Sequence, residues 1–263
     1  MVGKWLHERK TMLFRDLVSE YLDNRIFFDE IIQNHQKTGR VQYSMMEHWV
    51  GTESHKGKLW TLKDRCHYLL RNDKEKGSIL GYLFDWTIGS IFHQCIKLKE
   101  DVYQLEAYAP QYERLVDGEY PTGKLDQILR EMEQRMNVIS TSLKSELAEI
   151  ASLFQTADAH LARLLPRHSD NSLLVRFLIH NRHTVERVYG KDALDRILID
   201  MYPPGLHEAY YMAGLSYLDG GWYKEAMYLF QTGLTMAPGH EGLRKSLAEV
   251  RIREEQNMEK ENG

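Results

Sequence analysis

The chain has 263 residues, enough for one large domain or two small ones. Apolar residues make up 43% and charged residues 27%, the proportions of a globular protein that can bury a core without disulfides or structural metals. The formal net charge of −4 and the lack of a basic tract in the sequence argue against nucleic acid as a main partner.

The chain shows no sign of export or membrane insertion. Its two cysteines, Cys66 and Cys95, form no disulfide framework and fit a reducing compartment. The first residues, MVGKWLHERKTMLF, mix charges with apolar residues and do not read as a signal peptide. Asp85 and His93 interrupt the longest apolar stretch well short of the roughly 20 residues that span a bilayer. We therefore expect a cytoplasmic protein without a membrane span.

Helical periodicity dominates the first half. It predicts an amphipathic helix from Lys4 to about His35, short helices over residues 41–49 and 58–71, and a long helix from Gly81 to about Leu115. DGEYPTG, residues 117–123, marks the clearest break. No alternating strand pattern persists anywhere in the sequence. The prediction is an all-α protein whose residues 1–120 form a helical bundle.

The stretch GYLFDWTIGSIFHQCIKL, Gly81–Leu98, is apolar on nearly every face of a helix, which predicts a buried helix. A buried Asp85 or His93 then needs a partner or a chemical role. We expect Asp85 to pair with a Lys, Arg, His or indole N–H of a neighbouring helix, and His67 and His93 are the first histidines to check. Gly81 and Gly89, eight residues apart and hence near one face, suggest that another helix packs closely against this helix.

A metal centre is the alternative interpretation of these polar residues. Helical bundles with inward carboxylates and histidines can hold a di-iron or similar centre. The candidate ligands are Asp64, His67, Asp85, His93 and Glu100. The Glu-x-x-His pair typical of such centres is missing from the sequence, so pairing among buried polar residues is favoured over a metal, and no cofactor is expected. Cys66 and Cys95 are interpreted as small buried thiols.

Residues 124–165 lack both Pro and Gly and carry apolar residues at intervals of three and four, with polar exceptions at Glu146 and His160. Such a heptad pattern is typical of a coiled-coil strand or of the spine of a bundle. The spine is favoured because the preceding helices have apolar faces to cover. Residues 121–168 are thus expected to form a long connecting helix, and self-association through it stays open, so a homo-oligomer is one prediction.

The segment HEAYYMAGLSYLDGGWYKEAMYLFQTGLTMAPGH, residues 207–240, carries the most specific pattern. Small residues at Gly214 and Ala226 alternate with aromatic residues, and Pro238 ends the pattern. The residues in this register are Tyr210, Gly214, Tyr217, Ala226, Phe230 and Pro238. The segment resembles a tetratricopeptide repeat, whose period is 34 residues. It departs from the family at Ala213, where Leu is usual, and at Gly233, where Ala is usual.

One such repeat cannot bury its own apolar face, so neighbours are expected. Residues 174–206 offer a degenerate repeat, with Phe177 in the aromatic position and Ala193 matching Ala226 one repeat later. Residues 241–256 are apolar on one face and charged elsewhere, as expected for a capping helix. The prediction for residues 169–263 is a short array of paired helices closed by a cap.

The resemblance implies protein binding. Its inward positions on the first helix are Glu208, Tyr211, Leu215 and Asp219, a mixed acidic and aromatic face. The face lacks the lysine and arginine clamp of repeats that hold an acidic C-terminal tail, so that ligand class is disfavoured. An array this short could also be a structural appendage of the N-terminal domain.

The function favoured by the sequence is a non-enzymatic adaptor, scaffold or assembly chaperone that binds another protein. No phosphate-binding, nucleophile-elbow or zinc-protease motif occurs in the sequence. Two alternatives remain open. One is a metal- or cofactor-binding helical bundle whose repeats recruit a partner, and the other is a regulatory domain that senses a small ligand in the bundle.

Overall fold

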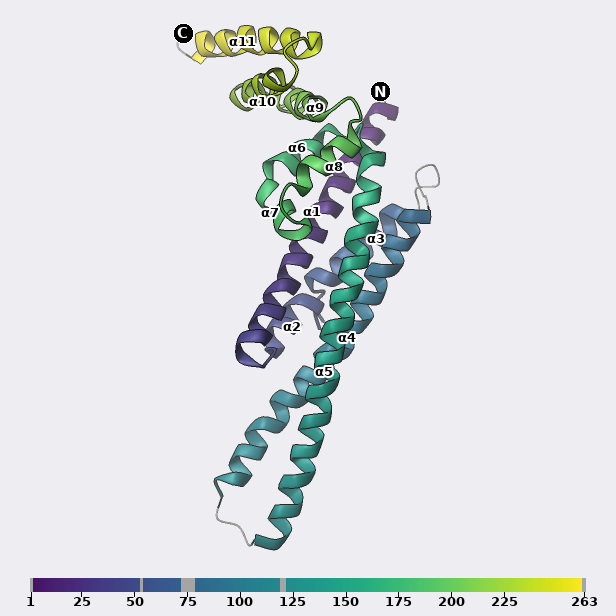
Figure 1. Ribbon diagram of the computed structural model, residues 1–263, viewed down its shortest axis with the longest axis vertical. Coiled ribbons are helices and arrows are strands. Elements are labelled where there is room, and N and C mark those ends of the chain that lie inside the picture. The colour runs from purple at the N-terminus through teal and green to yellow at the C-terminus, as the bar shows by residue number, and fades with distance from the viewer. Residues whose placement is uncertain (1, 53, 72–78, 119–121, 262–263) are drawn as a thin grey trace. The chain divides into compact units, whose positions relative to one another are not determined.

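The computed structural model describes residues 2–52, 54–71, 79–118 and 122–261 (Figure 1). In these ranges the chain is mostly helical and contains no strand apart from an isolated bridge between Gly51 and Lys56, which confirms the all-α prediction. The helices are α1 (Val2–Thr38), α2 (Tyr43–Val50), α3 (Lys58–Arg71), α4 (Ile79–Val116), α5 (Thr122–Leu164), the 3-10 helix η1 (Leu165–His168), α6 (Ser172–His180), α7 (Arg182–Tyr189), α8 (Ala193–Met201), α9 (Leu206–Asp219), α10 (Tyr223–Met236) and α11 (Glu241–Glu261).

The chain divides into two compact units. Unit 1 combines Met1–Leu22 with Leu161–Gly263, and unit 2 is Asp23–His160. These units differ from the predicted domains 1–120, 121–168 and 169–263. The first part of α1 belongs with the C-terminal helices, where the Phe14 ring stacks on His168 with ring centroids 3.5 Å apart. Most of the predicted connecting helix belongs to unit 2 and is not a domain of its own.

The core of unit 2 is built around Trp49 of α2. Its indole Nε1–H donates to Asn24 Oδ1 at 2.8 Å, and its ring lies 5.8 Å from that of Phe28 and 6.3 Å from that of Phe154. Nearby, Arg25 Nε of α1 donates to Asp158 Oδ2 of α5 at 3.2 Å. The hydrogen bond satisfies the buried indole, so the aromatic cluster ties α1, α2 and α5 together without an unpaired polar group at Trp49.

Helix α4 is buried on one side only. Phe84, Ile88 and Ile91 are fully buried, whereas Trp86 is 58% exposed and His93 is exposed. The prediction that this helix is buried on every face, and that His93 is buried with it, was therefore wrong. A β-carbon added at Gly81 would lie 3.7 Å from Leu70 of α3, in ordinary contact, whereas one added at Gly89 would meet nothing within 4 Å, so the predicted close packing is found at Gly81 but not at Gly89. The sequence shows how apolar a helix is, but how many other helices pack against it depends on the tertiary arrangement.

Both predicted buried thiols are confirmed. Cys66 of α3 and Cys95 of α4 are completely buried and form no disulfide. Burial raises the pKa of the Cys95 thiol well above its usual value, because the thiolate loses solvation. These thiols therefore serve as small apolar side chains of the core.

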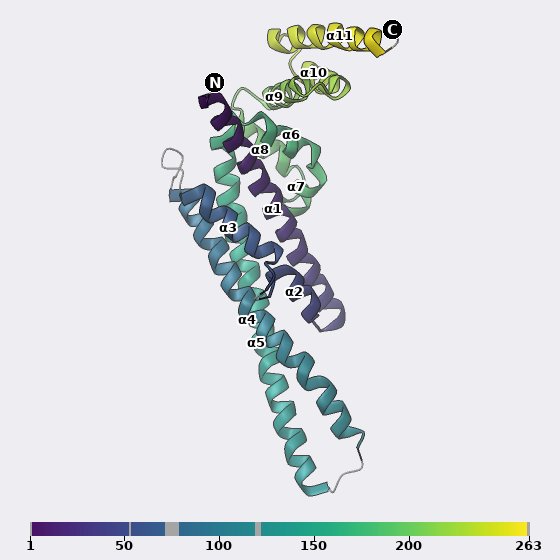
Figure 2. The same ribbon diagram turned by 180° about the vertical axis from the view of Figure 1, so that it is seen from behind.

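The far parts of α4 and α5 form a two-helix hairpin, which Figures 1 and 2 show side by side. Between Val102 and Leu143, none of the residues that the structure describes is buried. Pro110 lies inside α4 and deprives it of one backbone hydrogen bond. The Tyr112 hydroxyl of α4 donates to Glu133 of α5 across the hairpin. The predicted spine thus contributes to the core of unit 2 only from Leu143 onward.

In unit 1, α9 packs against α6, α8, α10 and α11, and α10 also packs against α11. The segment predicted as a degenerate repeat consists of three short helices, α6, α7 and α8. Asn181 separates α6 from α7, and its side-chain amide donates to Phe177 O at 2.9 Å. None of the helices in the described ranges has the length and apolar character needed to cross a membrane.

Candidate partner-binding site

The close pair α9–α10 organises this part of unit 1. Residues 220–222 join the two helices, and Gly221 takes a φ of 77° that glycine adopts without strain. A β-carbon at Gly214 would lie 2.4 Å from Phe230 Cε1, far inside van der Waals contact. The Phe230 ring therefore occupies the space left by the missing side chain. This is the contact between a small residue and an aromatic ring that the resemblance leads one to expect.

Helix α11 covers one side of the pair. Its Leu243 and Val250 are fully buried with Leu218, Ala226 and Phe230. Partly buried side chains surround this cluster: Tyr211, Leu215, Tyr217, Tyr223, Met227, Leu234 and Leu247. The apolar face of α11 thus packs onto the pair, while its other residues include the exposed ion pair of Arg253 with Glu249, as expected for a solvated cap.

The four predicted partner-binding residues lie on α9 with unequal exposure. Asp219 is exposed at the end of the helix, and Glu208 is partly exposed at its start. Tyr211 and Leu215 are partly buried and pack against the cluster beneath α11. Spaced at three and four residues, the four positions form one strip over about 16 Å at 1.5 Å per residue. We call these four residues the α9 strip.

The α9 strip is flanked by a cation. Arg176 of α6 lies over the Tyr217 ring at 4.9 Å and donates from Nη1 to Ser216 O at 3.3 Å. The Tyr217 ring and the Ser216 carbonyl hold this guanidinium in place beside the strip. Within the strip itself, the charged groups are the carboxylates of Glu208 and Asp219. The strip is therefore an acidic surface with an apolar centre.

A second cluster lies where α9 and α11 begin. His240 Nε2 lies 2.9 Å from Glu208 Oε2, and the Leu243 N–H donates to His240 Nδ1 at 3.1 Å. His240 thus caps the N-terminus of α11. The His207 ring centroid lies 5.4 Å from that of His240. Sequence reasoning missed this cluster, although His207 and His240 are the first and last residues of the repeat-like segment 207–240, which is the signal that could have found it.

The predicted partner of Asp85 is found in unit 2. Asp85, only 6% exposed, places Oδ2 3.7 Å from Nδ1 of His67, which is 60% exposed. A histidine of the neighbouring helix α3 therefore lies beside Asp85, at the surface rather than inside the bundle where the pairing was expected. The Asp85 carboxylate thus reaches from the core to a solvent-exposed ring, which lowers the cost of burying it.

The five candidate metal ligands do not converge. Asp64 forms an ion pair with Lys56 at 2.6 Å, and the exposed His93 lies with its ring edge against Phe92. Glu100 lies in a groove on another part of α4. Only His67 and Asp85 approach one another, so the described residues of unit 2 offer no set of three ligands for one ion.

That groove in unit 2 is lined by aromatic side chains of α2, α3 and α4, including Tyr43, Trp60, Phe92 and Tyr103. Trp60 and Phe92 meet edge to face at 5.1 Å, and Lys63 Nζ lies 4.8 Å from the Phe92 ring centre. The Lys99 ammonium donates to the carbonyl of Gly51. Lys99 thus has a partner within the protein, and Glu100 and Gln104 are further polar side chains that line the groove.

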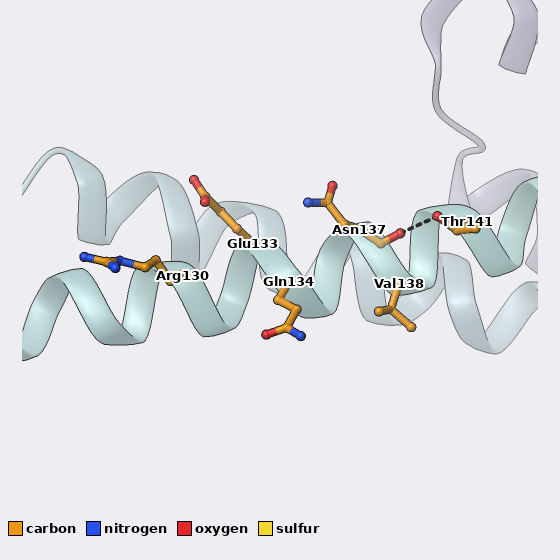
Figure 3. Close-up of a pocket in the computed structure, with 6 residues that line it drawn as sticks. All are labelled: Arg130, Glu133, Gln134, Asn137, Val138 and Thr141. Atoms are coloured by element: carbon orange, nitrogen blue, oxygen red, sulfur yellow. Dashed lines mark hydrogen bonds between the residues drawn. The ribbon is translucent and has the colours of Figure 1, made fainter.

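A second hollow lies on the α4–α5 hairpin and is shallower than the groove lined by α2, α3 and α4. Figure 3 shows its six residues along α5, with Glu133 and Asn137 on one side and Gln134 and Val138 on the other. The hydrogen bond drawn there joins Thr141 Oγ1 to Asn137 O at 2.8 Å, within the helix itself. The side chains do not converge on a common point, so this hollow is helix surface rather than a binding cavity.

No protein-family model, curated protein or solved structure matches the chain. The resemblance of residues 207–240 to a tetratricopeptide repeat therefore depends on the residues of that segment and on the contact between Gly214 and Phe230. The α9 strip stays the candidate site for a partner.

Proposed function

We propose that this protein is a non-enzymatic adaptor, scaffold or assembly chaperone that binds a segment of another protein along the α9 strip. The observation that carries the proposal is the close α9–α10 pair, in which the Gly214–Phe230 contact positions α9 and leaves Leu215 partly exposed. Protein surfaces that bind segments commonly combine a few apolar anchors with a polar rim.

The chemistry of the strip indicates the kind of segment that fits. Glu208 and Asp219 carry negative charge at its two ends, and Tyr211 and Leu215 supply an apolar centre. A segment with apolar residues in the middle and basic residues at its ends would complement both features. A helix of about three turns matches the length of the strip.

Site-specific photo-crosslinking tests this proposal. A photoreactive residue at position 215 is compared with one at Tyr228, which is 66% exposed on α10 and lies outside the strip. A partner captured at position 215 is then purified and its affinity measured by calorimetry. Leu215→Arg and Asp219→Lys should weaken binding at least tenfold, while Tyr228→Ala should leave it unchanged. Equal crosslinking at both positions, or binding insensitive to both strip variants, would exclude the α9 strip as the interface.

A further inference from the structure

We infer that His207, Glu208 and His240 form a binding site for one divalent transition-metal ion of the zinc class. One potential ligand atom from each residue lies within 4.8 Å of the others, and all three side chains are partly exposed. Among the residues that the structure describes, no other group of three histidine, cysteine or acidic side chains comes this close. The inference is independent of whether a partner binds the α9 strip.

Two imidazoles and one carboxylate suit zinc in chemical terms. Zinc binds histidine nitrogen and carboxylate oxygen at about 2.0–2.2 Å, and three protein ligands leave a fourth position for water. Ligands of one tetrahedral ion therefore stand roughly 3.4 Å apart, as follows from those bond lengths. His240 Nε2 and Glu208 Oε2, at 2.9 Å, are already near this separation. The His207 nitrogen lies within 4.8 Å of the other two ligand atoms and has to come closer to reach this separation.

The backbone before α9 leaves space for the His207 ring. Its ring lies against Gly205, where an added β-carbon would come within 3.0 Å of Nδ1. Gly205 has a φ of 133°, which glycine alone adopts readily. The first turn of α9 therefore holds His207 and Glu208 beside His240, although adjacent positions on a regular helix diverge by about 100°.

Metal binding requires one proton to move. In the free protein the neutral His240 ring accepts from the Leu243 N–H at Nδ1 and so carries its proton on Nε2, facing Glu208. An ion bound at Nε2 leaves the proton on Nδ1, and the Leu243 N–H loses its acceptor. The loss of this one hydrogen bond is small beside the bonds to the metal.

The bound ion would join the start of α9 to the start of α11. It would also neutralise the Glu208 end of the α9 strip.

The test uses tag-free full-length protein with Co²⁺ and Zn²⁺ as probes. We expect one equivalent of Co²⁺ to give visible absorption bands of a site with four or five ligands, and Zn²⁺ to displace it. His240→Asn removes the metal ligand but keeps an oxygen that accepts from the Leu243 N–H, and His207→Gln removes the second imidazole. Each variant should weaken Co²⁺ binding at least tenfold and keep the helical circular dichroism of the native chain.

His183→Gln, at an exposed histidine of α7, is the matched control and should bind Co²⁺ as the native chain does. The inference is overturned if the native chain shows no saturable binding of either ion. It is equally overturned if His207→Gln and His240→Asn bind as tightly as the native chain, or if His183→Gln loses binding to the same extent.

Discussion

Gly214 is the residue on which the α9–α10 pair depends. With the Phe230 ring in the space beside it, any side chain at position 214 must push the two helices apart or turn the ring. Overpacking of this kind typically costs about 1–3 kcal/mol, which exceeds the gain of up to about 1 kcal/mol from replacing a helical glycine by alanine. Gly214 thus lowers the intrinsic stability of helix α9 but allows α9 and α10 to pack closely.

We therefore expect Gly214→Ala to lower the free energy of unfolding by about 1–2 kcal/mol, measured by chemical denaturation. Gly89→Ala is the matched control, because an added β-carbon there meets nothing within 4 Å. That variant should be as stable as the native chain or more stable by up to about 1 kcal/mol. Combining Gly214→Ala with Phe230→Leu should recover part of the loss. Equal stability of the two alanine variants would contradict the close crossing.

His35, in α1 within unit 2, should make stability depend on pH. Burial, assisted by the positive charge of Lys144, lowers the pKa of His35 below its ordinary value. The folded state therefore favours the neutral ring, and the unfolded chain binds the proton more readily. The stabilising contribution is complete above about pH 6.5 and is lost as the pH falls toward the lowered pKa.

His35→Gln should accordingly flatten the pH dependence of the unfolding free energy between about pH 6.5 and 5. The measurement is denaturation at a series of pH values, with His183→Gln as the surface control. A variant whose stability still falls as steeply as that of the native chain would show that His35 does not carry this dependence.

At the scale of elements, the α4–α5 hairpin differs from the rest of unit 2. Its described residues between Val102 and Leu143 include none that is buried, whereas residues on the same two helices beyond these points form the core. Local opening requires little free energy where few apolar contacts are lost. The two halves of each helix should therefore differ in stability.

Hydrogen exchange followed by mass spectrometry can detect this difference. Amides of residues 104–116 and 125–140 should exchange well before those of residues 84–98 and 143–160. If the hairpin is instead protected, dilution distinguishes the causes. Protection lost on dilution would indicate that a second copy covers the hairpin, and protection that persists would contradict its low local stability.

The end of the repeat-like pair was predictable from Pro238, because α10 ends at Met236, shortly before this proline. The partner of Asp85 was predictable by type, since a buried carboxylate requires one. The exposure of Trp86 and the break between α6 and α7 at Asn181 were not predictable from the sequence, because both depend on neighbours far along the chain. The His207–His240 cluster was missed for the same reason: its members meet only after α9 and α11 pack.

At the scale of the whole molecule, unit 2 is a continuous segment with its own core of Trp49, Phe28 and Phe154. We expect residues 23–160 to fold when expressed alone, with helical circular dichroism, cooperative unfolding and blue-shifted Trp49 fluorescence. Trp49→Phe should keep the fold but remove the indole hydrogen bond to Asn24, lowering stability by about 1–3 kcal/mol. A fragment that is unfolded in both forms would show that the segment depends on unit 1.

The interleaving of the two units also bears on how the chain emerges from a ribosome. Every residue of unit 2 is synthesised before Leu161, the first residue of the second part of unit 1. During translation the segment containing Phe14 therefore has to wait until the region of His168 has been made. Unit 2 can complete its core in that interval, so the order of translation favours its folding before unit 1.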